Sequence, residues 1–426
     1  MPPASPGCAG THGFGRVSVI GLGYVGLPAA AVFAEHGVEV VGVDTNPEVV
    51  ACINRGQPHV GEPRLDALLR RVVEAGRLRA TTAPEPADAF IIAVPTPLAR
   101  AGEAGRPDLS HVEAAARAIA PVLSAGTLVV VESTVPVGTT ERVATLLAGL
   151  RPDLTFPPEA GEAASVQVAH CPERVLPGQV LHEVVHTPRV IGGLTRRCAE
   201  RAASLYRIMA QGECRLTDAR TAELAKLAEN AYRDVNIAFA NELSLICDRL
   251  GIDVWELIAL ANLHPRVDIL QPGPGVGGHC IAVDPWFIVA ASPEEARLIR
   301  TARQVNDAKP QHVCARVRDR AAQLKRPVIA CLGLSYKKDI DDLRESPAVE
   351  IVRLLAEERV GELLVVEPHI AALPPELARL GLALHEFDQA VERANLVLLL
   401  VDHGRFLEVS RDTLKDKIVV DTRGVW

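Results

Sequence analysis

The segment from Arg16 to Asp44 places the strongest constraint on the fold. It begins with a β-branched run, passes through glycines into an alanine-rich helical pattern, and returns to a second β-branched run. This order predicts one βαβ unit with two parallel strands. Gly21, Gly23 and Gly26 follow the first strand in the spacing G-x-G-x-x-G and open the helix. The glycines allow a tight turn, close approach of a pyrophosphate and close packing of helix on strand, so the unit predicts a dinucleotide site.

Asp44, at the end of the second strand, indicates which dinucleotide binds. Its carboxylate stands where it can bond the ribose hydroxyls of the adenosine, and it would repel a 2'-phosphate. The sequence therefore favours NAD over NADP, and a mere tight turn is the weaker alternative. We expect Tyr24 and Val25, which lie within the turn, to contact the cofactor too.

Further patterns predict the architecture of the whole chain. Buried-strand runs at 89–94 and 127–133, separated by a helical stretch at 109–123, continue a parallel doubly wound sheet. Strand patterns at 166–173 and 189–193 extend this region to about Gly212. We expect an NAD-binding Rossmann domain at 16–212.

The central part changes character. Residues 216–250 have apolar residues at helical spacing without Gly or Pro, and predict one long helix that ends before Gly251. Two further helical patterns follow, and from residue 324 the strand patterns return. The predicted fold class is α/β, with two Rossmann-like doubly wound domains joined by a central helical domain with a long helix. The predicted central domain is 213–323, and the second Rossmann-like domain is 324–426.

Composition limits the function classes. The chain of 426 residues is too long for one core, and 48% hydrophobic with 23% charged residues is typical of a soluble globular protein. No apolar run reaches the roughly 20 residues that a membrane span needs. A net charge of -8 argues against nucleic acid as the main partner. Residues 1–15 have neither a basic start nor an apolar stretch, so we expect a disordered tail rather than a signal peptide.

The cysteines favour a reducing compartment. Nine are scattered along the chain without a C-x-x-C pair, which fits neither a disulfide framework nor a zinc site. We therefore expect a cytoplasmic protein with no metal site. In such a compartment a thiol can stay free for chemistry.

Cys280 differs from the other cysteines in its surroundings. The stretch 273–280 holds four glycines, which permit close approach of the backbone to a substrate and are poorly suited to a core. Beside an NAD site, a thiolate can add to an aldehyde as a thiohemiacetal, which is oxidised to a thioester and hydrolysed. This predicts oxidation of an alcohol to an acid. Asp284, four residues later, is either catalytic or a turn residue before Pro285, and both alternatives stay open.

Together these motifs resemble the UDP-glucose/GDP-mannose dehydrogenase family. The resemblance runs from about Arg16 to the C-terminus and rests on the ordered stretches GLGYVGLP, AVPTP, ESTVPVG, CPERVLPG, KLAENAYRDVNIAFANELSLI, GPGVGGHCIAVDPWF and KKDIDDLRESP. Residues 264–290 and 419–426 are most similar to members that act on UDP-N-acetyl-D-mannosamine. The resemblance implies a four-electron oxidation of that sugar to its uronic acid with two NAD, for bacterial surface polysaccharide.

The resemblance also implies roles for individual residues. Cys280 would be the nucleophile, and Lys226 and Asn230, one helical turn apart, would steady the oxyanion. Lys226 would also shuttle the hydroxyl proton if desolvation lowered its pKa. Glu173 would serve water-mediated proton transfer and thioester hydrolysis. Thr134 completes the implied catalytic set.

Two groups of binding residues follow from the same resemblance. The cofactor would also contact Thr96, Ser133, Thr140 and Arg344. The UDP-sugar would contact, besides Lys226 and Asn230, the residues Arg174, Val175, Arg233, His264, Arg266, Gly277, Tyr336, Lys337 and Arg423. Arginine suits the diphosphate because it binds phosphate oxygens in pairs.

The implied assembly is a homodimer through the central helical domain, with Arg266 supplied across the interface. Three other functions stay open: a UDP-N-acetyl-D-glucosamine 6-dehydrogenase, a non-catalytic nucleotide-sugar-binding protein of the same fold, and a two-electron hydroxyacid dehydrogenase. The last has no need of the thiol. Loss of Cys280, Lys226 or Asn230 would have favoured the binding protein, and all three are present.

Overall fold

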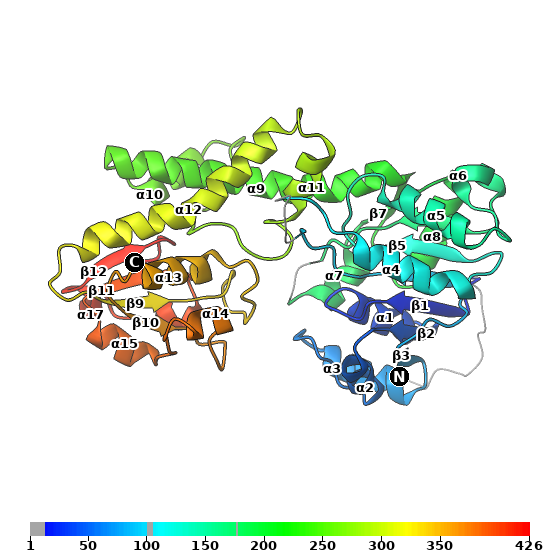
Figure 1. Cartoon of the computed structure of the whole chain (residues 1–426), viewed down its shortest axis with the longest axis horizontal. Coiled ribbons are helices and arrows are strands. Elements are labelled where there is room, and N and C mark those ends of the chain that lie inside the picture. The colour runs from blue at the N-terminus through cyan, green and yellow to red at the C-terminus, as the bar shows by residue number, and fades with distance from the viewer. Residues whose placement is uncertain (1–12, 100–104, 176–177) are drawn as a thin grey trace. The chain divides into compact units, whose positions relative to one another are not determined.

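The structure is a computed structural model that describes residues 13–99, 105–175 and 178–426 (Figure 1). Most of the tail predicted at 1–15 lies outside these residues. By its contacts the chain divides into two units, Met1–Ala228 and Glu229–Trp426. The division falls inside helix α9 (Ala219–Leu250). The predicted domain boundaries at 212/213 and 323/324 stay a prediction.

The first unit is built on an eight-stranded sheet with the strand order β3-β2-β1-β4-β5-β6-β7-β8. Its strands are β1 (Arg16–Ile20), β2 (Glu39–Val43), β3 (Leu78–Thr81), β4 (Ala89–Ile92), β5 (Leu128–Val131), β6 (Gln167–His170), β7 (Arg189–Gly193) and β8 (Cys214–Asp218). β4 is buried along its whole length, and its residues alternate between two cores: Ile91 lies in one and Phe90 in the other. This is the pattern of a sheet that is covered on both faces.

Helices cover both faces of this sheet. α1 (Gly26–Glu35), α3 (Leu65–Glu74), α7 (Val180–His186) and α8 (Arg196–Tyr206) contribute to one core, and α4 (Ser110–Ile119), η1 (Ala120–Val122) and α5 (Thr139–Leu150) to the other. α2 (Pro47–Asn54), α6 (Pro157–Ala160) and η2 (Gly161–Ala163) complete the unit. The doubly wound prediction is confirmed.

One strand pair departs from the predicted parallel sheet. β6 and β7 are antiparallel, with Ala169 opposite Gly193 and His170 opposite Gly192, whereas every other described pair in the sheet is parallel. Because β7 runs backwards, its first residue, Arg189, lies beyond the carboxyl end of β6. A residue that opens a parallel strand would lie at the opposite edge.

The long helix begins later than the sequence pattern suggests. We expected it from Leu216, but Leu216 lies in β8, which pairs with β7, and α9 begins at Ala219. Leu216 continues the apolar pattern of the helix, but its backbone hydrogen bonds complete the sheet. α9 then runs for 32 residues to Leu250, as predicted.

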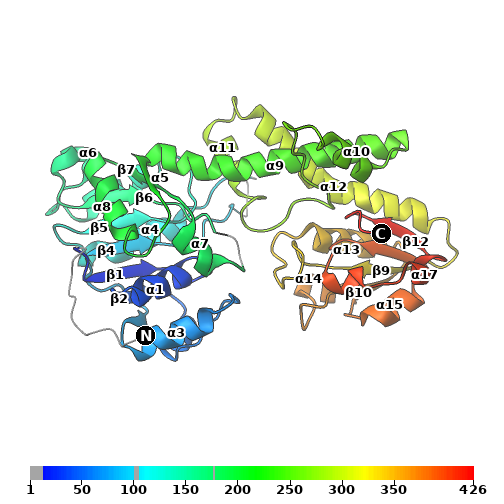
Figure 2. The ribbon, with the colours of Figure 1, turned by 180° about the vertical axis from the view of Figure 1, so that it is seen from behind.

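In the second unit, α9 packs beside α12 (Arg297–Ala321), as both views of the ribbon show (Figure 1, Figure 2). α10 (Val254–Ala261) and α11 (Asp284–Ala291) lie in the chain between them. Arg303 of α12 forms a buried ion pair of 2.6 Å with Asp234 of α9. The side-chain amide of Asn241 donates to the side-chain oxygen of Asn306, and the side-chain oxygen of Asn241 accepts from the backbone N–H of Gly273. The helix pair therefore holds the start of the glycine-rich stretch.

The second sheet is wholly parallel, with the order β10-β9-β11-β12. Its strands are β9 (Val328–Leu332), β10 (Glu362–Val366), β11 (Leu396–Leu399) and β12 (Ile418–Asp421). α12 and α13 (Pro347–Glu357) pack on one core, and α15 (Phe387–Arg393) and α16 (Gly404–Leu407) on the other. α14 (Pro375–Ala378) and α17 (Arg411–Leu414) are short. The predicted fold class is confirmed.

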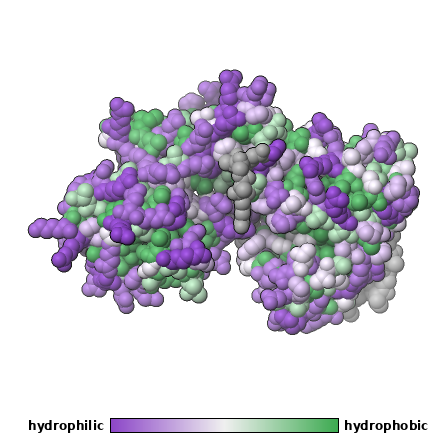
Figure 3. Space-filling model, viewed as in Figure 1, coloured by the Kyte–Doolittle hydropathy of each residue, from purple (hydrophilic) through white to green (hydrophobic). Residues whose placement is uncertain are grey.

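None of the described helices is long and apolar enough to cross a membrane. On the face shown in Figure 3, hydrophobic residues are interspersed with hydrophilic ones. All eight cysteines of the described residues are free thiols, as the scattered spacing predicted.

Candidate active site

The glycine turn after β1 has the geometry of a dinucleotide site. Gly21 has φ 93°, and a side chain there would meet the carbonyl of Ala93. A Cβ on Gly26 would lie 1.9 Å from the carbonyl oxygen of Gly21. At Gly23, by contrast, an added Cβ would have nothing within 4 Å. Two glycines are therefore required by the fold, and the third leaves the open space that a pyrophosphate needs.

Asp44 closes this turn. Its carboxylate accepts hydrogen bonds from the backbone N–H of Leu22 and of Asn46, at 3.1 and 2.9 Å. Tyr24 is 38% exposed, and Val25 precedes the first residue of α1. These residues fit NAD, because a carboxylate at the end of β2 can also bond ribose hydroxyls.

The predicted cofactor residues after β4 and β5 lie together, because these strands are neighbours in the sheet. The Thr96 hydroxyl donates to the carbonyl of Thr134 at 2.7 Å, and the Ser133 hydroxyl donates to the carbonyl of Val94 at 2.7 Å. Thr140 differs: its hydroxyl donates to Glu223 of α9 at 2.6 Å, so it holds two helices of the first unit together.

Glu173 lies at the carboxyl edge of the same sheet and is 9% exposed. One of its oxygens lies 3.5 Å from the guanidinium of Arg189, and the other accepts from the backbone N–H of Arg174. The side chain of Arg174 donates to the carbonyl of Pro188. Val175 packs against the hydrophobic core of this unit, so part of its side chain is structural.

The stretch that carries Cys280 packs tightly against the chain itself. A Cβ on Gly277 would lie 2.6 Å from the carbonyl oxygen of Glu345, and one on Gly278 would lie 2.9 Å from the Tyr336 ring. The backbone N–H of Gly278 donates to the carbonyl of Arg344 at 3.0 Å. In the structure the glycines allow the close approach of the protein's own segment 336–347, and their approach to a substrate stays a prediction.

Cys280 is half-buried, whereas five of the other described cysteines are buried. Its carbonyl accepts from the backbone N–H groups of Val283 and Asp284, at 3.0 and 2.8 Å. Asp284 then begins α11 and is 3% exposed. The thiol therefore stands on a tight turn at the N-terminal end of a helix.

Asn230 and Asp284 are brought into contact. The Asn230 amide donates to the Asp284 carboxylate at 2.5 Å, and Arg233 donates to the Asn230 carbonyl at 2.5 Å. Asn230 is 1% exposed. Lys226, one turn earlier on α9, is 8% exposed. The Asp284 carboxylate thus bonds the amide of a predicted catalytic residue, and both alternatives for Asp284 stay predictions.

The remaining predicted substrate residues of the second unit lie on loops. His264 and Arg266 are exposed after α10, and Lys337 is exposed after β9. Arg423 follows β12, donates to Asp402 at 2.9 Å and lies against Gly273. The side chain of Arg344, which we expected at the cofactor, donates three hydrogen bonds to the Asp342 carboxylate, and the backbone N–H of Arg344 donates a fourth.

The turn after β9 repeats the geometry of the turn after β1. Gly333 also has φ 93°, and Glu367 takes the place of Asp44, accepting from the backbone N–H of Leu334 and of Ser335 at 2.7 and 3.0 Å. Here, however, the carboxylate is only 4% exposed and also bonds the buried ring of His403 at 3.0 Å. Glu367 is therefore enclosed, whereas Asp44 lies at the surface of its turn.

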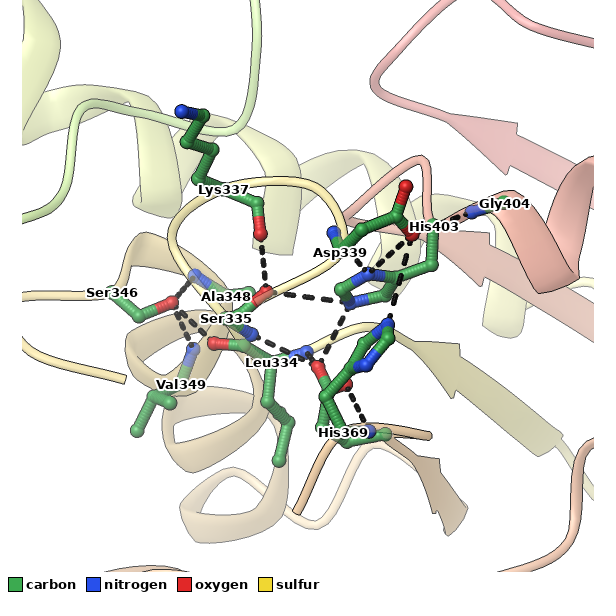
Figure 4. A network of polar contacts seen from close by, with 11 residues as sticks. Leu334, Ser335, Lys337, Asp339, Ser346, Ala348, Val349, His369, His403 and Gly404 are labelled. Carbon is green, nitrogen blue, oxygen red and sulfur yellow. Dashed lines mark hydrogen bonds and ion pairs between the residues drawn. The ribbon is translucent and has the colours of Figure 1, made fainter. Parts of the chain in front are cut away.

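A group of three possible metal ligands adjoins this turn: Asp339, His369 and His403 have ligand atoms within 4.8 Å of one another. In Figure 4 the three side chains lie together, with Asp339 on the loop after Lys337 and the rings of His403 and His369 beside it. His403 Nδ1 accepts from the backbone N–H of Asp339 at 2.9 Å, and its Nε2 bonds Glu367. Both ring nitrogens are thus used in holding the loop that carries Lys337, and the group is structural.

Sequence reasoning missed two charged residues beside Glu173. Glu132 directly follows β5 within the stretch ESTVPVG, and Arg189 opens β7. An acidic residue after a buried strand was a usable signal for Glu132. Arg189 had none, because only the antiparallel pairing brings it to this edge.

Comparison with known proteins agrees with this geometry. The UDP-glucose/GDP-mannose dehydrogenase family model of the NAD binding domain matches residues 15–210, that of the central domain residues 220–308, and that of the UDP binding domain residues 330–426. The NDP-N-acetyl-D-galactosaminuronic acid dehydrogenase of Ralstonia nicotianae is 60% identical over 97% of this chain and 96% of that protein. The UDP-N-acetyl-D-mannosamine dehydrogenase of Escherichia coli strain K12 is 57% identical over 97% and 99%. The structure of the UDP-D-ManNAc dehydrogenase of Pyrococcus horikoshii matches with a TM-score of 0.87, at 39% identity over 96% of both chains.

A Rossmann-like sheet with this glycine turn, followed by a UDP binding domain, defines an NAD-dependent oxidoreductase that acts on UDP-sugars. The chain belongs to the UDP-glucose/GDP-mannose dehydrogenase family.

Proposed function

We propose that this enzyme oxidises UDP-N-acetyl-D-mannosamine to UDP-N-acetyl-D-mannosaminuronic acid. The observation that carries the proposal is the similarity, over almost the whole of both chains, to proteins named for that substrate, at 57% and 39% identity. The half-buried Cys280 on its glycine-rich turn supports the four-electron course of the reaction, because a two-electron dehydrogenase needs no thiol.

The reaction divides between cofactor and protein. NAD, when bound, accepts a hydride in each of two oxidations, and the glycine turn with Asp44 would hold it. The Cys280 thiolate adds to the aldehyde from the first oxidation and forms a thiohemiacetal. The second oxidation leaves a thioester, and water cleaves its C–S bond to release the carboxylate and the thiol.

The protein groups have distinct duties in this scheme. Asn230 has two amide hydrogens; one is bonded to Asp284, and the other is for the oxyanion, together with the ammonium of Lys226. Asp284 positions Asn230. Glu173 accepts the proton of the water that attacks the thioester.

We assign the UDP-sugar to loops and helix ends that carry cationic side chains. The cations Arg233, His264, Arg266, Lys337 and Arg423 suit its diphosphate, as expected from the sequence. Gly277 and Tyr336 pack on one another in the structure. This contact supports a shared role in substrate binding, because a substrate that contacts one of these residues would then also affect the position of the other.

A second substrate is favoured by a specific observation. The relative at 60% identity is named for NDP-N-acetyl-D-galactosaminuronic acid. UDP-N-acetyl-D-glucosamine, expected from the sequence as the alternative, differs from the proposed substrate at one carbon. The test is turnover of the purified enzyme with the UDP derivatives of N-acetyl-mannosamine, N-acetyl-galactosamine and N-acetyl-glucosamine. The proposal requires the highest kcat/KM with the first and two NADH per uronate; preference for either other sugar would reassign the substrate.

The proposed assembly is a homodimer in the cytoplasm, serving surface polysaccharide. Tyr232, Phe239 and Ile246 of α9 support the dimer: they recur at seven-residue spacing and are 66%, 51% and 46% exposed. Apolar side chains at this spacing form one stripe along a helix, which suits a second copy of the same helix.

A further inference from the structure

Glu173 belongs to a buried cluster of four polar side chains in the first unit. Glu132, Arg189 and Tyr206 are 1%, 5% and 0% exposed, and Glu173 is 9% exposed. They come from the end of β5, the start of β7, the end of α8 and the loop after β6. The cluster lies beside the carboxyl edge of the sheet, where the family's cofactor domain binds its ligand.

Two carboxylates share one guanidinium in this cluster. Arg189 Nη2 lies 3.5 Å from Glu173 Oε2, and Nη1 lies 3.8 Å from Glu132 Oε1. If both carboxyl groups were ionised, the buried cluster would carry a net negative charge, which is costly where water is excluded. One proton on either carboxyl group makes the cluster neutral.

The surroundings of the two carboxyl groups decide which one holds the proton. The Tyr206 hydroxyl donates to Glu132 Oε1 at 3.1 Å. Each carboxyl group has one oxygen, Glu132 Oε2 and Glu173 Oε2, that is buried without a hydrogen-bond partner. Glu173 Oε1 accepts a bond of 2.7 Å from the backbone N–H of Arg174, which stabilises a charged carboxylate. Burial, and then repulsion from Glu173, raise the pKa of Glu132 to about 8.

The other titratable groups leave this balance unchanged. Burial raises the pKa of Cys171 to about 12 and that of Tyr206 well above its usual value, so both are neutral at pH 7. Burial lowers the pKa of Arg189, but charge interactions, of which the largest is with Glu173, raise it above its usual value, so the guanidinium stays charged. With Glu173, these are the titratable groups that face Glu132.

We propose that Glu132 is held as the neutral acid in the folded enzyme, so that the single carboxylate charge lies on Glu173 opposite Arg189. Glu132 and Arg189 are then positioning residues for the proton acceptor. This inference rests on the proposed function, in which Glu173 takes the proton of the attacking water while the new C–O bond forms and the C–S bond to Cys280 breaks. An ionised Glu173 at neutral pH is the state that this step requires.

The location of the proton is tested without turnover. Infrared spectra of the protein without substrate, recorded near pH 7, would show the carbonyl stretch of each neutral carboxylic acid. We expect Glu132→Gln to remove one such band, and Tyr206→Phe, which removes the hydrogen bond that Tyr206 donates to Glu132, to shift the frequency of that band. If Glu132→Gln leaves every band in place, or if Tyr206→Phe does not shift the band that Glu132→Gln removes, the proposal is overturned. Because no substrate is needed, this result stands even if the proposed reaction is wrong.

The role in catalysis is tested at Arg189. We expect Arg189→Met to lower kcat at least 100-fold with a small change in KM, and to accumulate the covalent Cys280 adduct, which mass spectrometry detects. Arg189→Lys keeps the charge and should restore part of kcat. Equal loss in both variants, without the adduct, would overturn the positioning role. If Arg189→Met does not fold, Tyr206→Phe provides a second variant, because it removes only a hydrogen bond to Glu132. We expect Tyr206→Phe to move the upper limb of the pH profile of kcat. An unchanged profile would overturn the proposal.

Discussion

The amide of Asn230 on α9 donates a hydrogen bond of 2.5 Å to the carboxylate of Asp284 at the start of α11, 54 residues further along the chain. Both groups are buried, so this bond fixes the direction of the amide beside the turn that carries Cys280. We expect Asp284→Ala to lower kcat by about 10- to 1,000-fold, because Asn230 loses its partner and the site loses its preorganisation. Asp284→Asn retains an acceptor oxygen and should lose less. Steady-state kinetics of both variants measure this, and equal rates in the two would rule out the orienting role.

Replacing the thiol should abolish acid formation. Cys280→Ser cannot form a thioester, so uronate production should fall by orders of magnitude, with the reaction stalling after the first oxidation. Product analysis and the ratio of NADH to uronate measure this. Cys52→Ser is the matched control, since Cys52 is also half-buried but lies on α2. Normal uronate yield from Cys280→Ser, with no adduct on Cys280 in the wild type, would refute covalent catalysis.

Packing between the Cys280 loop and segment 336–347 should be sensitive to one methyl group. Gly277→Ala places a Cβ 2.6 Å from the carbonyl oxygen of Glu345, so the backbone must shift. We expect a loss of about 1–3 kcal/mol in the free energy of unfolding, with reduced kcat. Gly149→Ala in α5 is the control, because nothing lies within 4 Å of its added Cβ. That variant should be neutral or slightly more stable in urea denaturation.

Stability should depend on pH through Glu132. Its pKa is raised from 4.5 to about 8 in the folded state, so between these values the folded protein holds one more proton than the unfolded chain. The contribution of Glu132 is therefore present at low pH and is lost as pH rises through this window, by at most roughly 1.4 kcal/mol per pH unit. Urea denaturation across the window should show that Glu132→Gln gains on the wild type as pH rises. Glu159→Gln, an exposed glutamate, should not.

The exposed stripe on α9 should hold the dimer together. Phe239→Glu places a charge in the middle of the stripe, and light scattering should show a shift from dimer to monomer. Leu298→Glu changes a residue of α12 that is 69% exposed and outside the stripe, and should leave the dimer intact. A monomeric wild type, or a dimeric Phe239→Glu variant, would exclude this interface.

Much of the fold was predictable because local patterns and long-range packing agree. The run of β-branched residues into Gly21 and on to Asp44 specifies one βαβ unit, and the structure has that unit. The long helix was predicted to its last residue, but its start was placed at Leu216. That residue satisfies a helical pattern and a strand pattern equally, and pairing with β7 decided between them.

The candidate site was predictable only in part. Cys280 and Asp284 were selected by residue type and spacing, and Asn230 by the resemblance to the family. Asn230 and Asp284 proved to be in contact. The sequence predicted close approach of the backbone at Gly277 and Gly278, but only the structure shows that segment 336–347 packs there, because a glycine does not specify what it approaches.

Short-range patterns in the sequence specified the class of cofactor and the order of the structural elements, and they predict the thiol chemistry. These depend on short spacings, in which the turn, the helix start and the reactive side chain are neighbours along the chain. Only the tertiary structure decided that Arg189 stands beside Glu173 and that Glu367 is enclosed by His403. The first contact depends on the direction in which two strands pair, and the second on which side chains are buried together. The identity of the side chains alone specifies neither the pairing direction nor the burial.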